Sequence, residues 1–328
     1  MNILASAEGP DATVSVIELR EKGERVLIID GFVTTSERGV SGSSSLLVQY
    51  MLWMGHLPML LHPDPKEALV ICFGTGQTAN ALRRENPKSL TIVDINPNVF
   101  KMAHYFTSNE NVLKDPRVRN LVMDGRAFMR RTEKTFDVIT LEPMPPTFAG
   151  VNALYSKEFY QLARERMSDN GIIAQWLPFH QVSAYHGASV SRTFTEVFPN
   201  AVLWIDPESL TGILLGSKND RGTLGSEFPG FKRNDLKRIL PEETVRKAVY
   251  LEKEGLKRYG EQYGDVITDD NQLLAYGAAA FNTHVNPVTL LLSNYDTMKI
   301  FRKGFYEDKG SLEIEQLELI KKESERKE

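Results

Sequence analysis

Between residues 68 and 216, short apolar runs alternate with stretches of helical periodicity. This alternation is typical of βα units, whose strands pair in one parallel sheet with helices on both faces. The pattern predicts an α/β fold with a doubly wound, mostly parallel seven-stranded sheet. The expected strands are residues 68–73, 90–93, 118–122, 136–141, 171–176, 201–205 and 212–215. The expected helices are residues 77–85, 97–105, 125–131, 157–167 and 184–197.

The segment before this alternation differs in kind. Residues 13–17 and 25–29 are β-rich runs around a charged, glycine-containing turn, which predicts a hairpin. A glycine- and serine-rich loop at residues 37–45 and an apolar helix follow. We therefore expect residues 1–62 to form a small N-terminal β-domain with a linking helix. Residues 63–328 would form the doubly wound domain with a C-terminal extension, whose expected helices are residues 241–259, 270–281 and 312–328.

Composition excludes several classes of function. The 39 basic and 43 acidic residues give a net charge of −4, so we expect a small-molecule partner and no nucleic acid. The single cysteine, Cys72, cannot form an intramolecular disulfide or a cysteine-paired metal site. We expect no metal and a cytoplasmic location. The most apolar window, residues 46–61, is too short and too often interrupted to span a membrane.

A glycine-containing turn lies between the first expected strand and its helix. Gly74, Thr75 and Gly76 form a G-x-G sequence, in which glycines let a ligand approach the backbone at a helix N-terminus. Ala79 occupies the position where a dinucleotide-binding loop favours a third glycine. The loop therefore predicts a mononucleoside ligand, although the same sequence is also compatible with a bare turn.

Acidic residues follow the next two expected strands. Asp94 comes 18 positions after Gly76, a spacing at which an acidic side chain accepts the ribose hydroxyls, and Ile95 follows it. Asp124 and Gly125 end the third strand, where they could contact an adenine edge. Both aspartates could instead cap the helices that follow them, and the two roles are compatible.

With these residues in place, the sequence resembles the spermidine synthase, or aminopropyltransferase, family, a branch of the adenosylmethionine-dependent methyltransferase superfamily. It is most similar to a divergent subgroup often fused to membrane-spanning segments. The matching positions are residues 27–33, 35–37, 50, 56, 58, 74, 76, 94, 115–118, 124–125, 136–139 and 154–160. The subgroup stretches are residues 142–150, 175–178 and 268–271.

The resemblance implies a Rossmann-like methyltransferase fold, an adenosyl sulfonium donor (decarboxylated adenosylmethionine or adenosylmethionine) and a polyamine or related amine as acceptor. It also implies a homodimer or homotetramer. Glu142 stands at the position of the family's catalytic aspartate, and it is our candidate base and a candidate donor contact. Tyr50 and Tyr155 are the other catalytic candidates. Gly74, Thr75, Gly76, Asp94, Ile95, Asp124 and Gly125 are the candidate donor-binding residues.

The sequence departs from the family on the amine side. Thr34, Leu52, Thr75 and Pro145 stand where relatives have polar or acidic groups. Methyl transfer to a small molecule is therefore an alternative, because Thr75 leaves room for a methionine carboxylate. A non-catalytic nucleoside-binding module is another. Residues 142–148 also admit comparison with amino-methyltransferases that carry a polar–Pro–Pro–aromatic motif, but the negative charge disfavours a nucleic-acid substrate.

Overall fold

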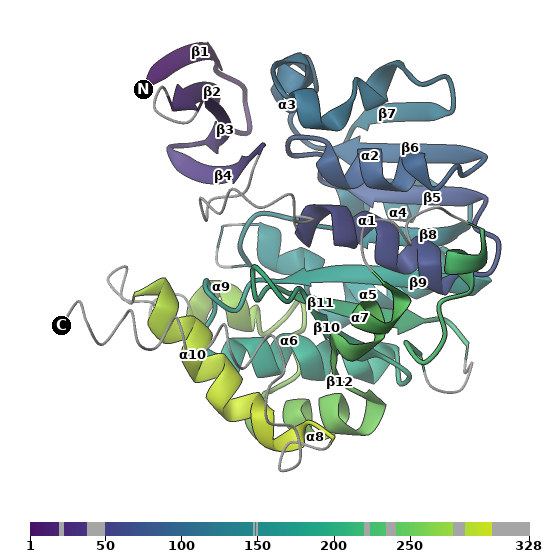
Figure 1. The fold of residues 1–328 in the computed structure, drawn as a ribbon. Coiled ribbons are helices and arrows are strands. Elements are labelled where there is room, and N and C mark those ends of the chain that lie inside the picture. Colours follow the sequence, from purple (N-terminus) through teal and green to yellow (C-terminus); the bar gives the residue numbers. More distant parts are fainter. Residues whose placement is uncertain are drawn as a thin grey trace.

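The computed structural model describes residues 1–19, 23–37, 50–146, 148, 150–219, 224–233, 241–277 and 286–303. An N-terminal antiparallel sheet lies beside one end of a larger sheet (Figure 1). Val14, Val16 and Leu27 attach it to the larger sheet by packing into a shared core with Phe73. The predicted hairpin is thus part of a four-stranded sheet in the order β1 (Asn2–Ala7), β2 (Val14–Leu19), β3 (Glu24–Ile29) and β4 (Phe32–Ser36).

The larger sheet has eight strands, so the prediction of seven was wrong. The additional strand, β12 (Val249–Leu251), pairs antiparallel with β10 at the edge, where Leu203 faces Leu251. All seven predicted strands are present. The order is β12, β10 (Val202–Ile205), β11 (Gly212–Ser217), β9 (Met167–Leu177), β8 (Phe136–Leu141), β5 (Glu67–Ile71), β6 (Ser89–Asp94) and β7 (Val118–Val122). Strands β5 to β9 pair in parallel, whereas β11 is antiparallel to both neighbours.

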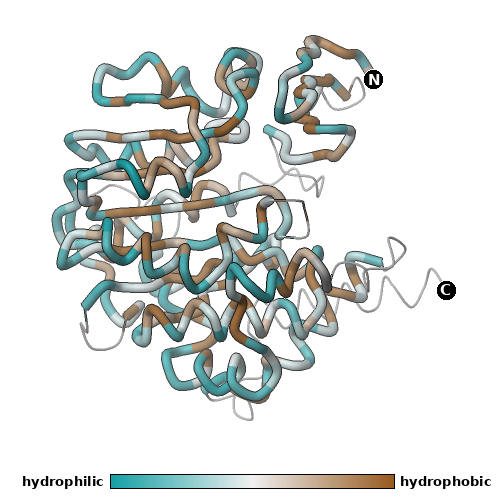
Figure 2. The backbone as a smooth tube through the Cα atoms, turned by 180° about the vertical axis from the view of Figure 1, so that it is seen from behind, coloured by the Kyte–Doolittle hydropathy of each residue, from teal (hydrophilic) through white to brown (hydrophobic). Residues whose placement is uncertain are grey.

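Helices cover both faces of this sheet because its strands bury alternate residues on each side. Hydrophobic stretches run along the central strands, whereas the outer helices mix hydrophobic and hydrophilic residues (Figure 2). One face packs against α4 (Gly125–Arg131), α5 (Lys157–Glu165), α6 (Ala184–Val197), α8 (Lys253–Tyr263) and α10 (Pro287–Met298). The other packs against α1 (Tyr50–Leu61), α2 (Gln77–Arg84), α3 (Pro97–Met102) and α7 (Glu242–Lys247).

The C-terminal predictions were less accurate. The helix expected over residues 241–259 is divided into α7, β12 and α8, and α10 was not predicted. The helix expected over residues 270–281 is present as α9 (Leu273–Gly277), and its remainder lies outside the described residues, as does the helix expected over residues 312–328. Among the described residues, no helix has both the length and the apolar character needed to cross a membrane.

Close packing of α1 on α2 positions the site. A side chain at Gly55 would place its Cβ 2.6 Å from the Cβ of Ala81 and 2.7 Å from the carbonyl oxygen of Thr78, so only glycine permits this approach. The first residue of α1, Tyr50, therefore lies beside the first turn of α2. Both helices begin at the edge where the parallel strands end, which is where ligands bind in doubly wound folds.

Candidate active site

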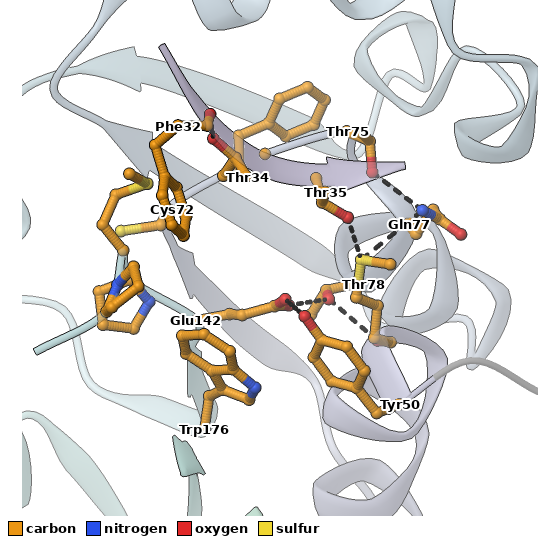
Figure 3. A pocket seen from close by; sticks show the side chains of 16 residues that line it. Phe32, Thr34, Thr35, Tyr50, Cys72, Thr75, Gln77, Thr78, Glu142 and Trp176 are labelled. Carbon is orange, nitrogen blue, oxygen red and sulfur yellow. Dashed lines mark hydrogen bonds between the residues drawn. The ribbon is translucent and has the colours of Figure 1, made fainter. Parts of the chain in front are cut away.

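A cavity opens at this carboxyl edge (Figure 3). Its walls come from β4, the start of α1, the glycine loop after β5, the loop after β8 and the end of β9. Five segments distant in the sequence thus meet around one space. The residues that line it are Phe32, Thr34, Thr35, Tyr50, Met51, Cys72, Phe73, Gly74, Thr75, Gln77, Thr78, Glu142, Pro143, Met144, Pro145 and Trp176.

The glycine loop has the conformation that its sequence requires. Gly74 and Gly76 have φ angles of 55° and 86°, in the left-handed region where glycine has no steric penalty. A Cβ on Gly76 would lie 2.5 Å from the ring of Phe73. The side-chain amide of Gln77 donates to the Thr75 hydroxyl oxygen at 3.0 Å, and the side-chain amide of Asn109 donates to the Thr75 carbonyl at 3.0 Å. The loop is therefore held firmly at the N-terminus of α2.

Asp94 links the glycine loop to the end of β6. One carboxylate oxygen accepts the backbone N–H of Phe73 at 2.8 Å, and the other accepts that of Asn96 at 2.9 Å. Burial raises the pKa of Asp94, and these two hydrogen bonds oppose the shift. Each oxygen keeps a second lone pair that a ribose hydroxyl could use. The neighbouring Ile95 is 50% exposed and offers an apolar surface at the same edge.

Asp124 performs the capping role that the sequence left open. Its carboxylate accepts the backbone N–H of Ala127 at 2.7 Å and thereby caps α4. Gly125 allows α4 to approach the sheet, because a Cβ there would lie 2.5 Å from Ile71. Asp94 ends β6 and Asp124 follows the adjacent strand β7, but neither lines the cavity. Their donor-binding role stays a prediction.

Glu142 lies in the cavity, between α1 and α2. The Tyr50 hydroxyl donates to one carboxylate oxygen at 2.8 Å, and the Thr78 hydroxyl lies 3.0 Å from the other (Figure 3). Desolvation raises the pKa of Glu142 to about 7, against the lowering effect of these two hydrogen bonds. Among the described residues that line the cavity, Glu142 is the only carboxylate. It can therefore exchange a proton near neutral pH.

The two candidate tyrosines have different environments. Tyr50 stacks on Trp176 with ring centroids 6.1 Å apart and an interplanar angle of 13°, so the two rings form one wall of the cavity. Tyr155 is fully buried in the core and does not line the cavity. The structure thus brings Glu142 and Tyr50 together in the cavity, whereas Tyr155 lies in the core behind it, near enough for its charge and those of Tyr50 and Glu142 to affect one another.

The structure also locates the residues that differ from the family pattern. Thr34, Thr75 and Pro145 line the cavity, whereas Leu52 packs against the hydrophobic core. The sequence analysis did not include Thr78 among the site residues. Its position in the first turn of α2, directly after the glycine loop, could have indicated it. No group of three or more potential metal ligands occurs among the residues that the structure describes.

The strand order, the glycine loop after β5 and the acidic residue after β6 define the methyltransferase-like class of α/β proteins. Residues 47–205 match the model of the spermine/spermidine synthase domain. Structural comparison shows a similar fold in a solved structure. The chain superimposes on a spermidine synthase from Thermotoga maritima with a TM-score of 0.61 and 21% identity, over 75% of this chain and 83% of that one.

Curated relatives are polyamine aminopropyltransferases. Polyamine aminopropyltransferase 2 of Pseudomonas aeruginosa is 30% identical over 180 residues, which is 53% of this chain and 50% of the relative. The polyamine aminopropyltransferase of Bacillus subtilis is 29% identical over 212 residues, or 62% of this chain and 74% of the relative. The chain spans between half and two thirds of the length of several relatives that it matches.

Proposed function

We propose that this chain is an aminopropyltransferase-type enzyme. It would transfer the aminopropyl group of decarboxylated adenosylmethionine to a small amine. The observation that carries the proposal is the Glu142 carboxylate, which Tyr50 and Thr78 hold in a cavity beside the glycine loop. The domain match and the aminopropyltransferase relatives support the same reaction class.

The proposed reaction requires a base. The acceptor nitrogen attacks the carbon next to the sulfonium sulfur, a C–N bond forms, the C–S bond breaks, and methylthioadenosine leaves with the electron pair. A primary ammonium has a pKa near ~10, so it must lose a proton before it attacks. Glu142 would orient the amine and accept that proton, a role that suits a carboxyl group whose pKa is about 7.

The donor would lie along the carboxyl edge. Its ribose would bind Asp94, its adenine would lie over Ile95 near Asp124, and its sulfonium would lie by the glycine loop near Glu142. A spermidine synthase of the same fold is known in complex with the transition state analogue AdoDATO. In this chain, an anionic Glu142 would stabilise the positive sulfonium electrostatically.

Methyl transfer from adenosylmethionine is the second candidate. The observation that favours it is Thr75, a neutral residue of the cavity whose hydroxyl is already hydrogen-bonded to Gln77. A carboxylate at this position would repel the methionine carboxylate, and a threonine does not. The two reactions therefore differ in which donor the loop accepts.

Calorimetric binding of adenosylmethionine, its decarboxylated form and methylthioadenosine, followed by product analysis with putrescine and spermidine, tests the proposal. Preference for the decarboxylated donor with amine turnover supports aminopropyl transfer, and preference for adenosylmethionine supports methyl transfer. Binding without turnover indicates a nucleoside-binding module. If no adenosyl compound binds at millimolar concentration, the proposal fails. The expected homodimer or homotetramer stays a prediction that light scattering can check.

A further inference from the structure

Strand β4 is the wall of the cavity that the N-terminal sheet contributes. Phe32, Thr34 and Thr35 line the cavity, and Figure 3 shows them across the space from Glu142 and Trp176. Among the described strands, β4 pairs with β3 alone, so its position over the cavity depends on contacts with the larger domain. The position of β4 therefore decides how easily water reaches the candidate base.

One side chain joins the end of β4 to two other walls of the cavity. Gln77, the first residue of α2, is 3% exposed. Its side-chain amide donates to the Ser36 carbonyl at 3.0 Å and to the Thr75 hydroxyl oxygen at 3.0 Å, which uses both amide hydrogens. The same nitrogen lies 3.6 Å from the sulfur of Met51 in α1. Gln77 thus links β4, the glycine loop and α1.

Two further contacts hold β4 over the cavity. The Thr35 hydroxyl donates to the sulfur of Met51 at 3.1 Å, although a thioether is a weak acceptor. At the other end of β4, the rings of Phe32 and Phe148 meet edge to face with centroids 4.9 Å apart. The rest of the N-terminal sheet is attached by the apolar contacts of β2 and β3. Loss of the Gln77 hydrogen bonds should therefore release β4 locally without detaching the sheet.

We propose that Gln77 is a positioning residue that closes the cavity: its amide holds β4 against the glycine loop, and the strand then limits the access of water to Glu142. The inference goes beyond the proposed function, because it concerns the closure of the cavity and applies to any ligand bound there. Exclusion of water strengthens the attraction between a carboxylate and a cation. It also keeps the carboxyl group buried, and burial is the largest cause of the raised pKa of Glu142.

Cys72 provides a probe of this closure, because it is the single cysteine of the chain and lines the cavity. Mass spectrometry measures the rate at which N-ethylmaleimide labels Cys72 at pH 8 in wild type, Gln77→Met and Asn80→Ala. Methionine is about as long as glutamine but has no hydrogen to donate. Asn80 is the matched control: it is buried on the same helix, donates to the Ser108 carbonyl at 3.1 Å and does not line the cavity.

We expect Gln77→Met to increase the labelling rate about 10-fold, because two buried hydrogen bonds that keep the cavity closed are lost, and Asn80→Ala to leave it within about twofold. Thr35→Val should increase the rate less, since it removes only the bond to sulfur. An unchanged rate in Gln77→Met overturns the inference. An equal increase in Asn80→Ala also overturns it, because α2 would then loosen as a whole. If circular dichroism shows that Gln77→Met is unfolded, the rate in Thr35→Val decides in the same way.

The pH dependence of adenosyl sulfonium binding is a second readout, which a role in packing alone would not change. Entry of water should lower the pKa of Glu142, so Gln77→Met should move the change in affinity from about pH 7 to lower pH, and Asn80→Ala should not. Faster labelling without this shift overturns the link between closure and Glu142. The labelling comparison needs no ligand, so it stands apart from the proposed function. If methylthioadenosine fails to slow the labelling of Cys72, that result counts against the proposed donor site alone.

Discussion

At the scale of single residues, the proton on Glu142 is linked to the hydroxyl of Thr78. This hydroxyl has one hydrogen but lies within hydrogen-bonding distance of two oxygens, the Met51 carbonyl at 2.9 Å and Glu142 at 3.0 Å. When Glu142 is protonated, it can donate to Thr78, which then donates to Met51. When Glu142 is ionised, the Thr78 hydroxyl donates its hydrogen to the carboxylate instead of to the Met51 carbonyl. Loss of the proton therefore removes a hydrogen bond from the start of α1.

The affinity for a cationic donor should depend on pH. Because the pKa of Glu142 is raised to about 7, its carboxyl is neutral below that pH and negative above it. We expect the affinity for an adenosyl sulfonium to increase as the pH rises from 6 to 8, by about 5- to 10-fold, whereas neutral methylthioadenosine should bind equally throughout. Calorimetry at several pH values measures both. Glu142→Gln should abolish the pH dependence and turnover while keeping methylthioadenosine bound; a dependence that survives this substitution contradicts the assignment.

Removal of the Tyr50 hydroxyl should shift the pH profile. The hydrogen bond from Tyr50 lowers the pKa of Glu142, so Tyr50→Phe should raise this pKa and leave less of the base ionised at neutral pH. We expect transfer at pH 7 to fall about 10-fold and to recover partly at pH 9. A rate loss of the same size at every pH would show that Tyr50 only packs against Trp176. A phenylalanine at position 50 can still stack on Trp176, so Tyr50→Phe removes the hydroxyl and keeps the ring packing.

Sequence reasoning found the residues of the site that belong to local patterns. The glycine loop and Glu142 line the cavity, each follows a strand, and strand ends can be recognised from apolar runs. Contacts between remote segments were harder to predict. Thr78 and Glu142 are 64 residues apart, and the parallel pairing of β5 with β8, in which Ile71 faces Leu141, brings their segments together. Tyr155 has a motif position like the others, but its side chain turns into the core.

At the scale of elements, the left-handed turn before α2 can be tested by adding one methyl group. Gly76→Ala would introduce both an unfavourable φ of 86° and a Cβ 2.5 Å from Phe73. Gly150→Ala is the matched control, because its φ is 80° but its Cβ would have nothing within 4 Å. We expect a loss of about 1–2 kcal/mol for the control and roughly 3 kcal/mol for Gly76→Ala, with weaker nucleoside binding only in the latter. Urea unfolding measures both, and equal losses would contradict the steric argument.

The elements that the sequence predicted well are those with a strong periodic signal. Helices α4 and α6 have the predicted bounds, since a capping residue, Asp124 or Ser183, precedes each of them. β12 was missed because it has only three residues, lies between two charged helices and owes its pairing to β10. β1 was missed for a related reason, because it is an edge strand whose burial comes from its neighbours.

At the scale of the whole molecule, two groups of acidic residues have pKa values shifted in opposite directions. Away from the site, Glu110, Asp115 and Asp269 bind arginines, and these contacts lower their pKa values. At the carboxyl edge, Asp94, Glu142, Asp206 and Glu208 have raised pKa values, and burial is the largest cause for each. Carboxylates with raised pKa values that gather at one edge are typical of a functional site rather than of a stabilising network. The net charge of −4 does not distinguish these two groups.

The stability of the molecule should reflect this arrangement. Burial raises the pKa of Asp206 to about 6 in the folded state, so the fold holds this proton more tightly than the unfolded chain does. Stability is therefore lost as the pH rises from about 4 to about 6, and the loss is complete above that range.

Asp206→Asn removes this dependence and keeps an oxygen for Ser209. We expect the free energy of unfolding of the variant, relative to wild type, to increase by roughly 1.5 kcal/mol between pH 5 and pH 8. Urea unfolding at both pH values measures this, with Asp169→Asn as the exposed control. A constant difference would mean that Asp206 is balanced by a charge in the folded state, whereas an increasing difference would show that burial of the ionised carboxylate lowers stability.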